Sequence, residues 1–432
     1  MITNTRVVVT GLGIVAPGAQ NTNAFLQNLK AGKSGIAFLP DLAENGFECQ
    51  IGGIAKVGAV GDETWYDYFD LEQASDFIQL ACKAGVEAWE SSGLTLPDFN
   101  SPAVDWDTGM IIGSGFAGMD VVAKKVVPLT KEGNPKKLGS FGVQHTMGSG
   151  AAAQLSTILG IGNQVTANSS ACCTGTEAIL DAYYKIQTGL ATRMVVGSVE
   201  GYSPYIWAQF DAARVLNRKF NDRPQEASRP MSESARGVVP SSGAGVLIIE
   251  TLASATDRGA PIYAEILGGL CNSGGQRGTG SMTYPNNEGV LRCLTLAMER
   301  TGVSPEEINL ISGHLTATKA DPLEVKNWKT ALQLPDADFP MINAPKSIFG
   351  HALAGAGSLE SVACILQLHH RFIHPSINCK DIHQEISKLI LPEKIPQEMI
   401  EAPDLNIVMK ASFGFGDVNA CLIFRRWNSD GT

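Results

Sequence analysis

The chain has 432 residues, of which 44% are hydrophobic and 18% are charged, proportions typical of a globular protein with a large interior. Its formal net charge of −10 argues against a general nucleic-acid-binding protein. The 9 cysteines are scattered and form no CxxC pair, which argues against a zinc site or a redox dithiol.

The sequence also lacks the patterns that direct a chain to a membrane. Residues 1–10 have neither the charged start nor the apolar run of a signal peptide. No uninterrupted apolar stretch is long enough to span a bilayer. We therefore expect a reduced, cytoplasmic protein with no membrane contact.

Hydrophobic periodicity predicts alternating strands and helices along the first half of the chain. A strand at 7–10 is predicted to end in a turn at Gly11 and Gly13, and a helix capped by Thr22 follows. The next predicted elements are a helix at 75–91, a strand at 109–112, a helix at 148–159, a strand at 164–167, a helix at 172–187 and a strand at 194–197.

The second half repeats this order. The segments 243–250 and 262–267 are predicted to be strands that pair with each other. They are followed by a helix at 288–301, a strand at 308–312, a helix at 323–332, a strand at 341–343, a helix at 357–372 and strands at 406–410 and 420–424. Such alternation indicates sheets covered by helices on both faces, and its recurrence indicates two similar halves, residues 1–255 and 256–432. Two polar, glycine-rich loops, 221–245 and 272–287, are predicted connections or lids.

Two adjacent cysteines, Cys172 and Cys173, lie in the segment SSACCTGTEAI at a predicted junction of strand and helix. A thiol in the first turn of a helix lies near the positive end of the helix dipole and near free backbone N–H groups. Both favour the thiolate, the form that attacks a thioester. The opposite interpretation is two buried packing residues, because free cysteines are usually buried and inert.

Two histidines lie beside turns rich in small residues. His314 occurs in GHLTATKAD, and His351 occurs in PKSIFGHALAGAGSLE, five residues after Lys346. A Claisen condensation needs a nucleophile, donors that stabilise the departing carboxylate and the enolate, and an oxyanion hole. One cysteine and two neutral histidines supply the first two, and backbone N–H groups of a glycine-rich turn supply the third.

Six segments resemble, in order, the motifs of the elongating β-ketoacyl-acyl-carrier-protein synthases, the ketosynthases of the thiolase superfamily. They are VTGLGIVAPG, SSACCTG, SRPMSESARGVVPSSGAG, GHLTAT, PKSIFGHALAGAG and FGFGDVN, and they span almost the whole chain. The resemblance implies an α/β protein of thiolase-like fold, with two similar βαβαβαββ halves stacked as a five-layered αβαβα sandwich. It also implies a dimer and an acyl carrier protein as partner.

The resemblance further implies roles for individual residues. Cys172, rather than Cys173, would carry the acyl chain, while His314 and His351 would hold the malonyl thioester and assist decarboxylation. The remaining implied roles are an ordering and polarising lysine at Lys346 helped by Glu360, pantetheine contacts at Thr316 and Thr318, oxyanion-hole N–H groups at Cys172 and Phe415, an acyl-pocket gate at Phe415, and carrier docking at Arg214. No metal and no bound cofactor are implied, since the 4′-phosphopantetheine arrives on the carrier protein.

The chain also departs from the family pattern. Leu315 replaces a small residue beside the expected pantetheine path, and the stretch from 314 to 321 is one residue shorter. Asp417 and Val418 replace Gly and Thr in the predicted gating loop, and Pro345 precedes the lysine. The helix start at 70–76, often basic in the family, is acidic. These changes leave every catalytic group in place but leave the acyl range, the loop movement and the carrier identity open.

Related activities fit less well. A thiolase would need a second catalytic cysteine in the C-terminal loop, whereas Cys421 lies in a predicted strand beyond it. An initiating synthase would carry Asn in place of His351, and a silent chain-length subunit would lack the nucleophile. Two pathways stay open: fatty-acid elongation by a homodimer, and a specialised polyketide or polyene pigment pathway with a homologous, catalytically silent chain-length subunit as the partner in a heterodimer.

Overall fold

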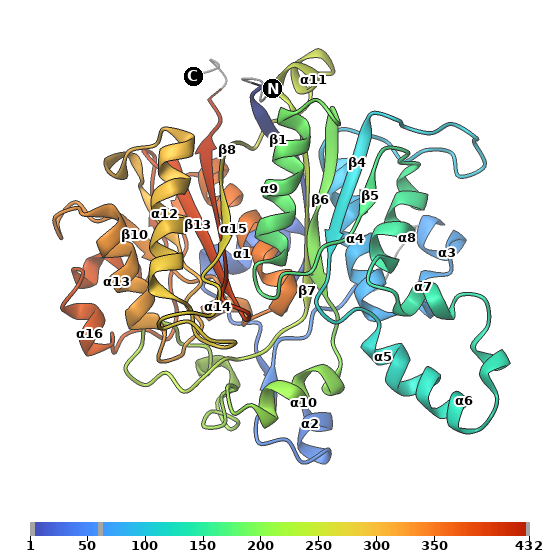
Figure 1. Cartoon of the computed structure of the whole chain (residues 1–432), viewed down its shortest axis with the longest axis horizontal. Coiled ribbons are helices and arrows are strands. Elements are labelled where there is room, and N and C mark those ends of the chain that lie inside the picture. Colours follow the sequence, from blue (N-terminus) through green and yellow to red (C-terminus); the bar gives the residue numbers. More distant parts are fainter. Residues whose placement is uncertain (1–4, 59–63, 429–432) are drawn as a thin grey trace.

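The computed structural model describes residues 5–58 and 64–428, so the first four residues of the region searched for a signal peptide lie outside it. Ten strands form the main sheet, in the order β10-β9-β13-β14-β8-β1-β7-β6-β4-β5 (Figure 1). Five belong to the N-terminal half: β1 (Val7–Val15), β7 (Gly243–Thr251), β6 (Arg193–Glu200), β4 (Thr108–Gly113) and β5 (Val165–Thr166). Five belong to the C-terminal half: β8 (Ala264–Ser273), β14 (Val418–Arg426), β13 (Ile407–Gly414), β9 (Leu310–Ser312) and β10 (Met341–Asn343).

The strands of the two halves pair in the same way. β1, β7 and β6 are antiparallel neighbours, and β6, β4 and β5 are parallel. In the C-terminal half, β8, β14 and β13 are antiparallel neighbours, and β13, β9 and β10 are parallel. The halves join where Val7–Val9 of β1 faces 264–266 of β8, at the end of the sheet where both termini lie. This repeat confirms the predicted architecture of two similar halves.

Helices cover the outer faces of both halves of the main sheet and also lie between the two halves (Figure 1). Between the two halves lie α9 (Thr174–Gln187) and α15 (Ala356–His370). The outer face of the N-terminal half carries α4 (Asp76–Ser91) and α8 (Gly150–Leu159), and the outer side of the C-terminal half carries α12 (Asn287–Thr301) and α13 (Asp321–Leu332). The resulting order of helices and strands is the predicted five-layered αβαβα sandwich.

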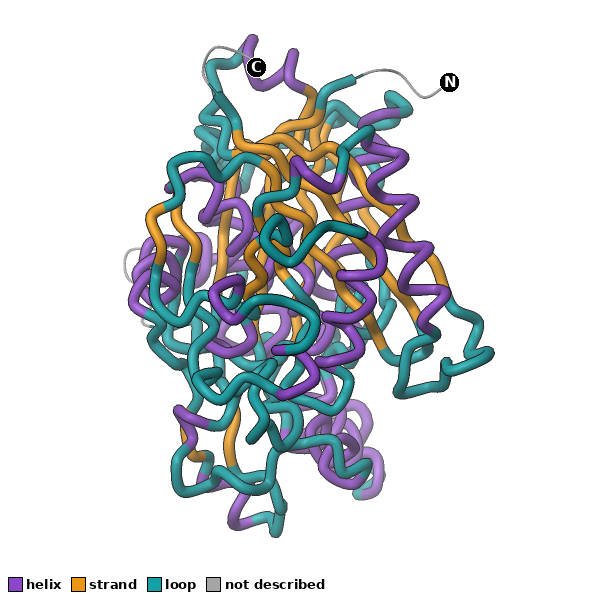
Figure 2. Tube along the Cα trace, turned by 90° about the vertical axis from the view of Figure 1, so that its left-hand side faces the viewer, coloured by secondary structure: helices purple, strands orange, loops and turns teal. Residues whose placement is uncertain are grey.

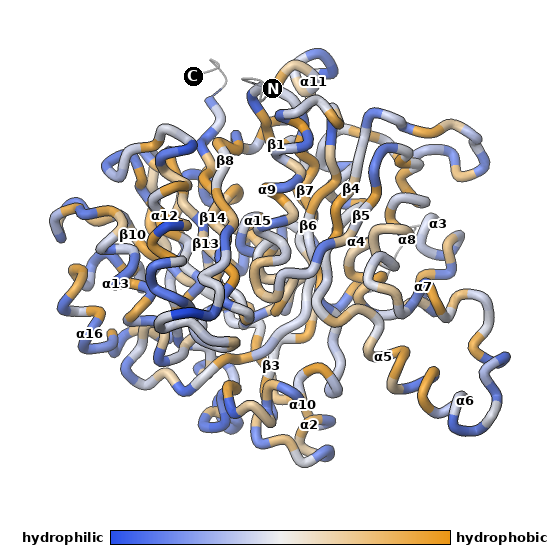
Figure 3. The backbone as a smooth tube through the Cα atoms, viewed as in Figure 1, coloured by the Kyte–Doolittle hydropathy of each residue, from blue (hydrophilic) through white to orange (hydrophobic). Residues whose placement is uncertain are grey.

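The uninterrupted apolar run of β7 shows how the sequence produces these layers. Leu247 and Ile249 join the central core with α9 and α15, while Val246 and Ile248 join the outer core with α4 and α8. Successive side chains of a strand point to opposite faces, so a strand with helices on both sides is apolar at nearly every position. In Figure 3 the hydrophobic stretches accordingly lie on the central strands, and hydrophilic stretches lie on outlying loops such as that beside α6 (Val127–Lys131).

The remaining short elements lie mostly at the periphery. The helices among them are α1 (Thr22–Ala31), α2 (Pro40–Glu44), α3 (Thr64–Tyr68), α5 (Met119–Val121), α7 (Gly142–Thr146), α10 (Pro204–Ala212), α11 (Leu252–Asp257), α14 (Lys346–Phe349) and α16 (Gln384–Ser387). Two small sheets pair β2 (Ala37–Phe38) with β3 (Ile51–Gly52) and β11 (Phe372–Ile373) with β12 (Ile400–Glu401). Loops gather at the end of the molecule away from the termini, as Figure 2 shows. The proposed domain boundary between 255 and 256 falls inside α11 and stays a prediction.

The predicted turn at Gly11 and Gly13 is wrong, because both residues lie inside β1. A methyl group on Gly13 would lie 1.8 Å from the Ala84 carbonyl oxygen, and one on Gly11 would lie 2.1 Å from that of Ala88. These glycines therefore let α4 lie directly on the backbone of β1.

Three smaller expectations also need correction. The segments 243–250 and 262–267 are strands, but β1 lies between them, so they do not pair with each other. The cap of α1 is Asn21, whose side chain accepts a hydrogen bond from the backbone of Ala24, while Thr22 is the first helical residue. The helix predicted to reach 372 ends at His370, because the chain enters β11.

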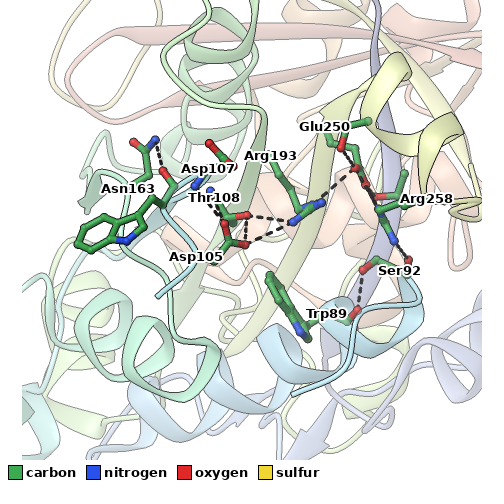
Figure 4. Close-up of polar contacts among 12 residues, drawn as sticks. Trp89, Ser92, Asp105, Asp107, Thr108, Asn163, Arg193, Glu250 and Arg258 are labelled. Atoms are coloured by element: carbon green, nitrogen blue, oxygen red, sulfur yellow. Dashed lines mark hydrogen bonds and ion pairs between the residues drawn. The ribbon is translucent and has the colours of Figure 1, made fainter. Parts of the chain in front are cut away.

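A network of ion pairs fastens the N-terminal half at the end where β1 begins (Figure 4). The carboxylate of Glu250 is fully buried at the end of β7 and lies 2.5 Å from Arg258 and 3.5 Å from Arg193. Arg193 also reaches Asp105, in the segment before β4, at 3.4 Å. One buried carboxylate thereby links two strands and the segment after α11. Among the described residues, no helix is both long and apolar enough to cross a membrane.

Candidate active site

A cavity of about 750 Å³ lies between the two halves, and most of the predicted site residues line it. Its walls include Cys172 from the N-terminal half and His314 and His351 from the C-terminal half. The predicted pantetheine, gating and docking residues Thr316, Thr318, Phe415 and Arg214 also line it. Lys346 and Glu360 lie behind this wall, where both are buried.

Two glycines determine where the halves meet. A methyl group on Gly175 of α9 would lie 2.4 Å from the backbone nitrogen of Ser358, and one on Gly357 of α15 would lie 2.5 Å from that of Thr176. Only residues without a Cβ allow the first turns of α9 and α15 to approach so closely. This contact brings Cys172, just before α9, next to groups from the start of α15.

Cys172 lies two residues before α9 and is 9% exposed, at the wall of the cavity. Burial raises the pKa of its thiol to about 11, although the nearby charge of Lys346 and a hydrogen bond from the backbone N–H of Phe415 oppose this rise. Burial of the sulfur therefore opposes the thiolate that the helix start was expected to favour. The desolvation of the sulfur outweighs the N–H groups around it.

Cys173 has a different environment from its neighbour. Its sulfur lies 3.2 Å from the carbonyl oxygens of Ser412 and Val418, on the β13–β14 hairpin. Burial raises the pKa of this thiol well above its usual value. Cys173 therefore packs against the C-terminal sheet, and only Cys172 presents its sulfur to the cavity wall described above.

The two histidines face each other across the site. Their ring centroids are 5.3 Å apart at an interplanar angle of 84°, and ligand atoms of both rings and the Cys172 sulfur lie within 4.8 Å of one another. His351 Nδ1 accepts a hydrogen bond from the Leu353 backbone at 3.1 Å, and His314 Nδ1 lies 3.4 Å from the ammonium of Lys346. Since both Nδ1 atoms face donors, each neutral ring carries its proton on Nε2.

Burial, followed by the charge of Lys346, lowers the pKa of both histidines well below the usual value. Both imidazoles are therefore neutral at physiological pH. Each ring then offers one N–H donor without bringing a further positive charge into the site. Two such donors are what the expected decarboxylation requires.

Lys346 is held by two strong acceptors. It donates to the backbone oxygen of His314 at 2.6 Å and forms an ion pair with Glu360 Oε1. The second carboxylate oxygen of Glu360 lies 3.0 Å from another buried lysine, Lys410 of β13. The sequence analysis did not identify Lys410, although a lysine inside the apolar strand sequence IVMKAS is a signal that could have revealed it.

Two acidic residues of α13 hold the His314 loop and were also missed. Glu324 accepts hydrogen bonds from the backbone of His314 at 2.6 Å and of Leu315 at 2.8 Å, and burial raises the pKa of its carboxyl to about 7. Asp321 accepts from the backbone of Thr316 and Ala317 at 3.0 and 3.1 Å. These carboxyl groups position the loop from one side.

The same contacts correct the expectation for Leu315. Its φ of 22° lies in a region that favours glycine, so the position does resemble one normally held by a small residue. Its side chain, however, is fully buried in the outer core of the C-terminal half. Leu315 therefore packs away from the pantetheine path instead of narrowing it.

Phe415 lines the cavity close to Cys172. It is half-buried, and its ring centroid lies 6.1 Å from that of Phe210. A methyl group on the preceding Gly414 would lie 3.1 Å from the Cys172 nitrogen, so this loop approaches the nucleophile closely. The backbone N–H groups of Cys172 and Phe415 thus lie at the same side of the site, as an oxyanion hole requires.

A metal ion would find a poor site among these residues. One thiol and two imidazoles are zinc ligands by type, and they are the described His, Cys, Asp and Glu groups that cluster closely enough to be considered. The ammonium of Lys346, beside His314 Nδ1, would however repel a cation. The expected absence of a metal stays a prediction.

Comparison with known proteins agrees with this geometry. The family model for the N-terminal domain of β-ketoacyl synthases matches residues 4–255, and the model for the C-terminal domain matches 263–380. The chain belongs to the β-ketoacyl synthase family. This confirms the family that the sequence motifs predicted, together with its thiolase-like fold and its acyltransferase class. It also confirms the predicted activity, the decarboxylative elongation of a fatty-acid or polyketide chain.

Individual relatives cover the whole length. The 3-oxoacyl-[acyl-carrier-protein] synthase 2 of Vibrio cholerae is 33% identical over 425 residues, which cover 98% of this chain and 99% of the relative. Among solved structures, a type II polyketide acyl-carrier protein in complex with its ketosynthase bound to the hexaketide, AntDE:AntF, has a TM-score of 0.85 at 28% identity, with 98% and 100% of the two chains covered. The ishigamide ketosynthase/chain length factor has a TM-score of 0.85 at 25% identity, with the same coverage.

Proposed function

We propose that this β-ketoacyl synthase carries its acyl chain on Cys172 and uses His314 and His351 to decarboxylate a malonyl thioester. The observation that carries the proposal is the convergence of the Cys172 sulfur and the two imidazoles within 4.8 Å, with each Nδ1 atom facing a donor. Nucleophile and N–H donors therefore face the same reacting position.

In the first step, the sulfur of Cys172 attacks the carbonyl carbon of an incoming acyl thioester. The carbonyl oxygen becomes negative and accepts hydrogen bonds from the backbone N–H groups of Cys172 and Phe415. The new carbon–sulfur bond to Cys172 replaces the bond to the carrier thiol, which leaves with the proton that Cys172 loses. Because one thiol replaces another, no lasting base is needed, which suits a thiol with a raised pKa.

In the second step, the carbonyl oxygen of a malonyl thioester accepts hydrogen bonds from both Nε2–H groups. The bond to the malonyl carboxylate breaks, CO2 leaves, and its electron pair passes to the adjacent carbon as an enolate that these donors stabilise. The enolate carbon attacks the acyl carbonyl, a carbon–carbon bond forms, and Cys172 departs as a thiolate that takes up a proton. Neutral imidazoles suit this step because each ring donates an N–H hydrogen bond to the enolate oxygen without first having to be protonated.

The pantetheine arm and the carrier protein would enter through the mouth of the cavity. The hydroxyl groups of Thr316 and Thr318 lie 3.1 Å apart on its wall and offer partners to the amides of the arm. Arg214 is exposed at this wall, where an acidic carrier could reach it. On this proposal the enzyme keeps no cofactor of its own, and the 4′-phosphopantetheine arrives with the carrier.

A projecting segment supports a partner subunit. The arm formed by α5, α6 and α7 stands off the body of the molecule (Figure 1). It exposes Val127 at 41%, Phe141 at 63% and Val143 at 73%, an apolar surface that is costly in water. A homologous subunit, as in the solved ketosynthase/chain length factor, would cover it. Whether that subunit is a second copy or a silent partner separates fatty-acid elongation from a polyketide or polyene pathway.

The test is to purify the protein with the products of its neighbouring genes and to identify the chain bound to Cys172 by mass spectrometry. The proposed function requires an acyl adduct on that residue and its loss, together with condensation, in Cys172→Ala. A wild-type enzyme that condenses without acylating Cys172 would contradict the proposal. The composition of the purified complex answers the question of homodimer or heterodimer in the same experiment.

A further inference from the structure

Lys410 is a fully buried lysine in the middle of β13. Strand alternation places it on the inner face with Val408, which belongs to the central core, while Met409 and Ala411 belong to the outer core. An ammonium group is strongly disfavoured in such surroundings unless its charge is paired and its donors are satisfied. Its position therefore calls for an explanation beyond packing.

The ammonium of Lys410 is surrounded by three oxygen atoms. It lies 3.0 Å from Glu360 Oε2, donates to Thr176 Oγ1 at 2.7 Å and also donates to Ser412 Oγ. The two hydroxyl oxygens are themselves 2.8 Å apart. Two hydroxyl acceptors and one carboxylate oxygen at ion-pair distance therefore surround the ammonium group, although the contact with Glu360 Oε2 lacks hydrogen-bond geometry.

Glu360 is shared between two lysines. Lys346 takes one carboxylate oxygen and Lys410 takes the other, and all three side chains are at most 2% exposed. Two ammonium groups on one carboxylate leave a formal charge of +1 in the protein interior. Lys346 carries this charge to the histidines, because it donates to the backbone oxygen of His314 and lies 3.4 Å from His314 Nδ1.

We propose that Lys410 is a positioning residue that fixes Glu360 from behind, thereby holds Lys346 against His314, and adds a second positive charge behind the wall that carries the two histidines. This inference rests on the proposed function, since it concerns the decarboxylation step. Lys410 touches no substrate on this view and acts through Glu360 and Lys346.

The titratable groups near Lys410 agree with this role. Its charge lowers the pKa of His314 and of His351, after the larger effects of burial and Lys346. The charge of Lys410 also lowers the pKa of four nearby thiols, although burial has the larger effect and raises it. They are Cys173, Cys271, Cys364 and Cys421. These thiols stay neutral near physiological pH, so they do not obscure the response of the histidines when the charge of Lys410 is removed.

The first test compares wild type with Lys410→Met, which keeps the length of the side chain and removes its charge. We expect the turnover of malonyl-carrier decarboxylation to fall about tenfold, the lower end of the 10- to 100-fold loss that is typical when a residue orienting a functional side chain is removed. We expect KM and the rate of Cys172 acylation to change less than about twofold. We also expect the acidic limb of the pH–rate profile, the fall of the decarboxylation rate at low pH, to move to higher pH, because histidines without a nearby cation protonate more readily.

Met409→Ala is the matched control, since it removes a buried side chain from the adjacent position on the opposite face of β13. It should lower the melting temperature without moving the acidic limb. If Lys410→Met behaves in the same way, with an unchanged limb and an unchanged rate in the folded fraction, Lys410 is a packing residue and the inference is wrong. A wild type that does not decarboxylate malonyl carrier would instead contradict the proposed function.

A milder pair of variants covers the case in which Lys410→Met does not fold. Thr176→Val removes one acceptor of the ammonium, whereas Thr176→Ser keeps the hydroxyl group. The inference requires the valine variant to shift the limb in the same direction and the serine variant to restore it. NMR titration of labelled histidines in wild type adds a direct measurement, and a His314 or His351 that titrates at the usual pKa of about 6.5 would overturn the inference.

Discussion

Cys172 and Cys173 are neighbours in sequence but have different surroundings. The sulfur of Cys172 faces the histidines, whereas that of Cys173 contacts the carbonyl oxygens of the β13–β14 hairpin. Local sequence could not distinguish them, because both lie at the same helix start. The distinction comes from contacts with residues more than 200 positions away.

We predict that Cys172 is the cysteine that becomes acylated. Cys172→Ala should abolish condensation, because no other sulfur meets both imidazoles in the described part of the chain. Cys173→Ala should retain most of the activity. Peptide mapping after incubation with an acyl-carrier thioester checks this, and a label confined to Cys173 would disprove the assignment.

The histidines give a prediction on pH. Their lowered pKa values keep both rings neutral in the folded enzyme below pH 6.5, so decarboxylation should persist there and decline only at more acidic pH. The unfolded chain does bind protons on these rings below about pH 6.5, so the contribution of the two histidines to folding stability should decrease as the pH falls through that value. Rate profiles and thermal melts across pH 5–8 measure both, and a rate that halves near pH 6.5 would contradict the neutral-histidine mechanism.

His351→Ala should reduce malonyl decarboxylation about 100-fold or more, because one of two preorganised donors is lost. Acylation of Cys172 should change much less, since the backbone N–H groups of the oxyanion hole are untouched. A separate assay of each half-reaction checks this. Parental decarboxylation in the variant would show that the donors lie elsewhere.

The sequence predicted the reacting groups better than the residues that hold them. Cys172, His314 and His351 could be found from motifs, because chemistry restricts which residue types serve there. Glu324 and Lys410 could not, because their roles depend on strand alternation and on the helix that packs against the loop. A carboxylate that accepts backbone hydrogen bonds looks in sequence like any other acidic residue of a helix.

At the scale of elements, the gating loop is fastened to a second loop. Asp417 is 1% exposed, and its carboxylate accepts hydrogen bonds from the backbone nitrogens of Gln276 and Asn286, both at 2.8 Å. The backbone of Gly416 also donates to the Met282 oxygen at 2.8 Å. The sequence left the movement of the Phe415 loop open, and these contacts restrict it by tying it to the loop between β8 and α12.

We predict that Asp417→Gly loosens both loops together. Hydrogen exchange should rise in 274–286 as well as in 414–418, because two hydrogen bonds from a buried carboxylate are lost. Acyl preference should change while Cys172 keeps its reactivity toward an alkylating reagent. Exchange measured by mass spectrometry decides this, and protection that falls in only one of the two loops would show that they move independently.

Phe415→Ala should leave the fold intact, and the acyl and malonyl groups should then bind in a less strictly defined order. The ring is half-buried and meets Phe210 at the cavity, so its removal opens the tunnel instead of emptying the core. Acylation kinetics alongside thermal melting test this. A large loss of stability with unchanged kinetics would identify Phe415 as packing and not as a gate.

Element boundaries were predicted well where apolar periodicity was strong and poorly where tertiary contacts override local signals. The predicted strand at 341–343 coincides with β10. Gly11 and Gly13 gave a false turn, because glycine marks both a turn and a backbone contact, and only the helix at 76–91 distinguishes them. The insertion of β1 between β7 and β8 involves partners far apart in the chain, which periodicity does not encode.

At the scale of the whole molecule, the Glu250 network yields a stability prediction. Burial opposes ionisation of Glu250, but hydrogen bonds from Arg258, Thr10 and Ser254 and the charge of Arg193 outweigh it and lower its pKa. Glu250→Gln should therefore cost about 3–5 kcal/mol, because two arginines lose a buried partner. The contribution of the Glu250 carboxylate to folding stability is present above its pKa in the unfolded chain and is lost as the pH falls through its lower pKa in the folded protein.

Denaturant unfolding at pH 7 and pH 4 measures this effect. Glu265→Gln is the control, since the partners of Glu265, Arg6 and Arg425, are 34% and 35% exposed and can be rehydrated. It should lose clearly less stability than Glu250→Gln. Equal losses would show that burial of the arginines does not determine the cost.

The contact at Gly175 and Gly357 has a consequence for how such enzymes can be recombined. Cys172 lies just before α9 and Glu360 lies within α15, and the two helices touch through bare backbone. A chimera with its crossover between β7 and β8 would inherit this contact from two parents. We expect a hybrid to retain activity only when one parent supplies glycine at position 175 and the other supplies glycine at position 357. The two halves therefore have to match at this contact and cannot be exchanged freely.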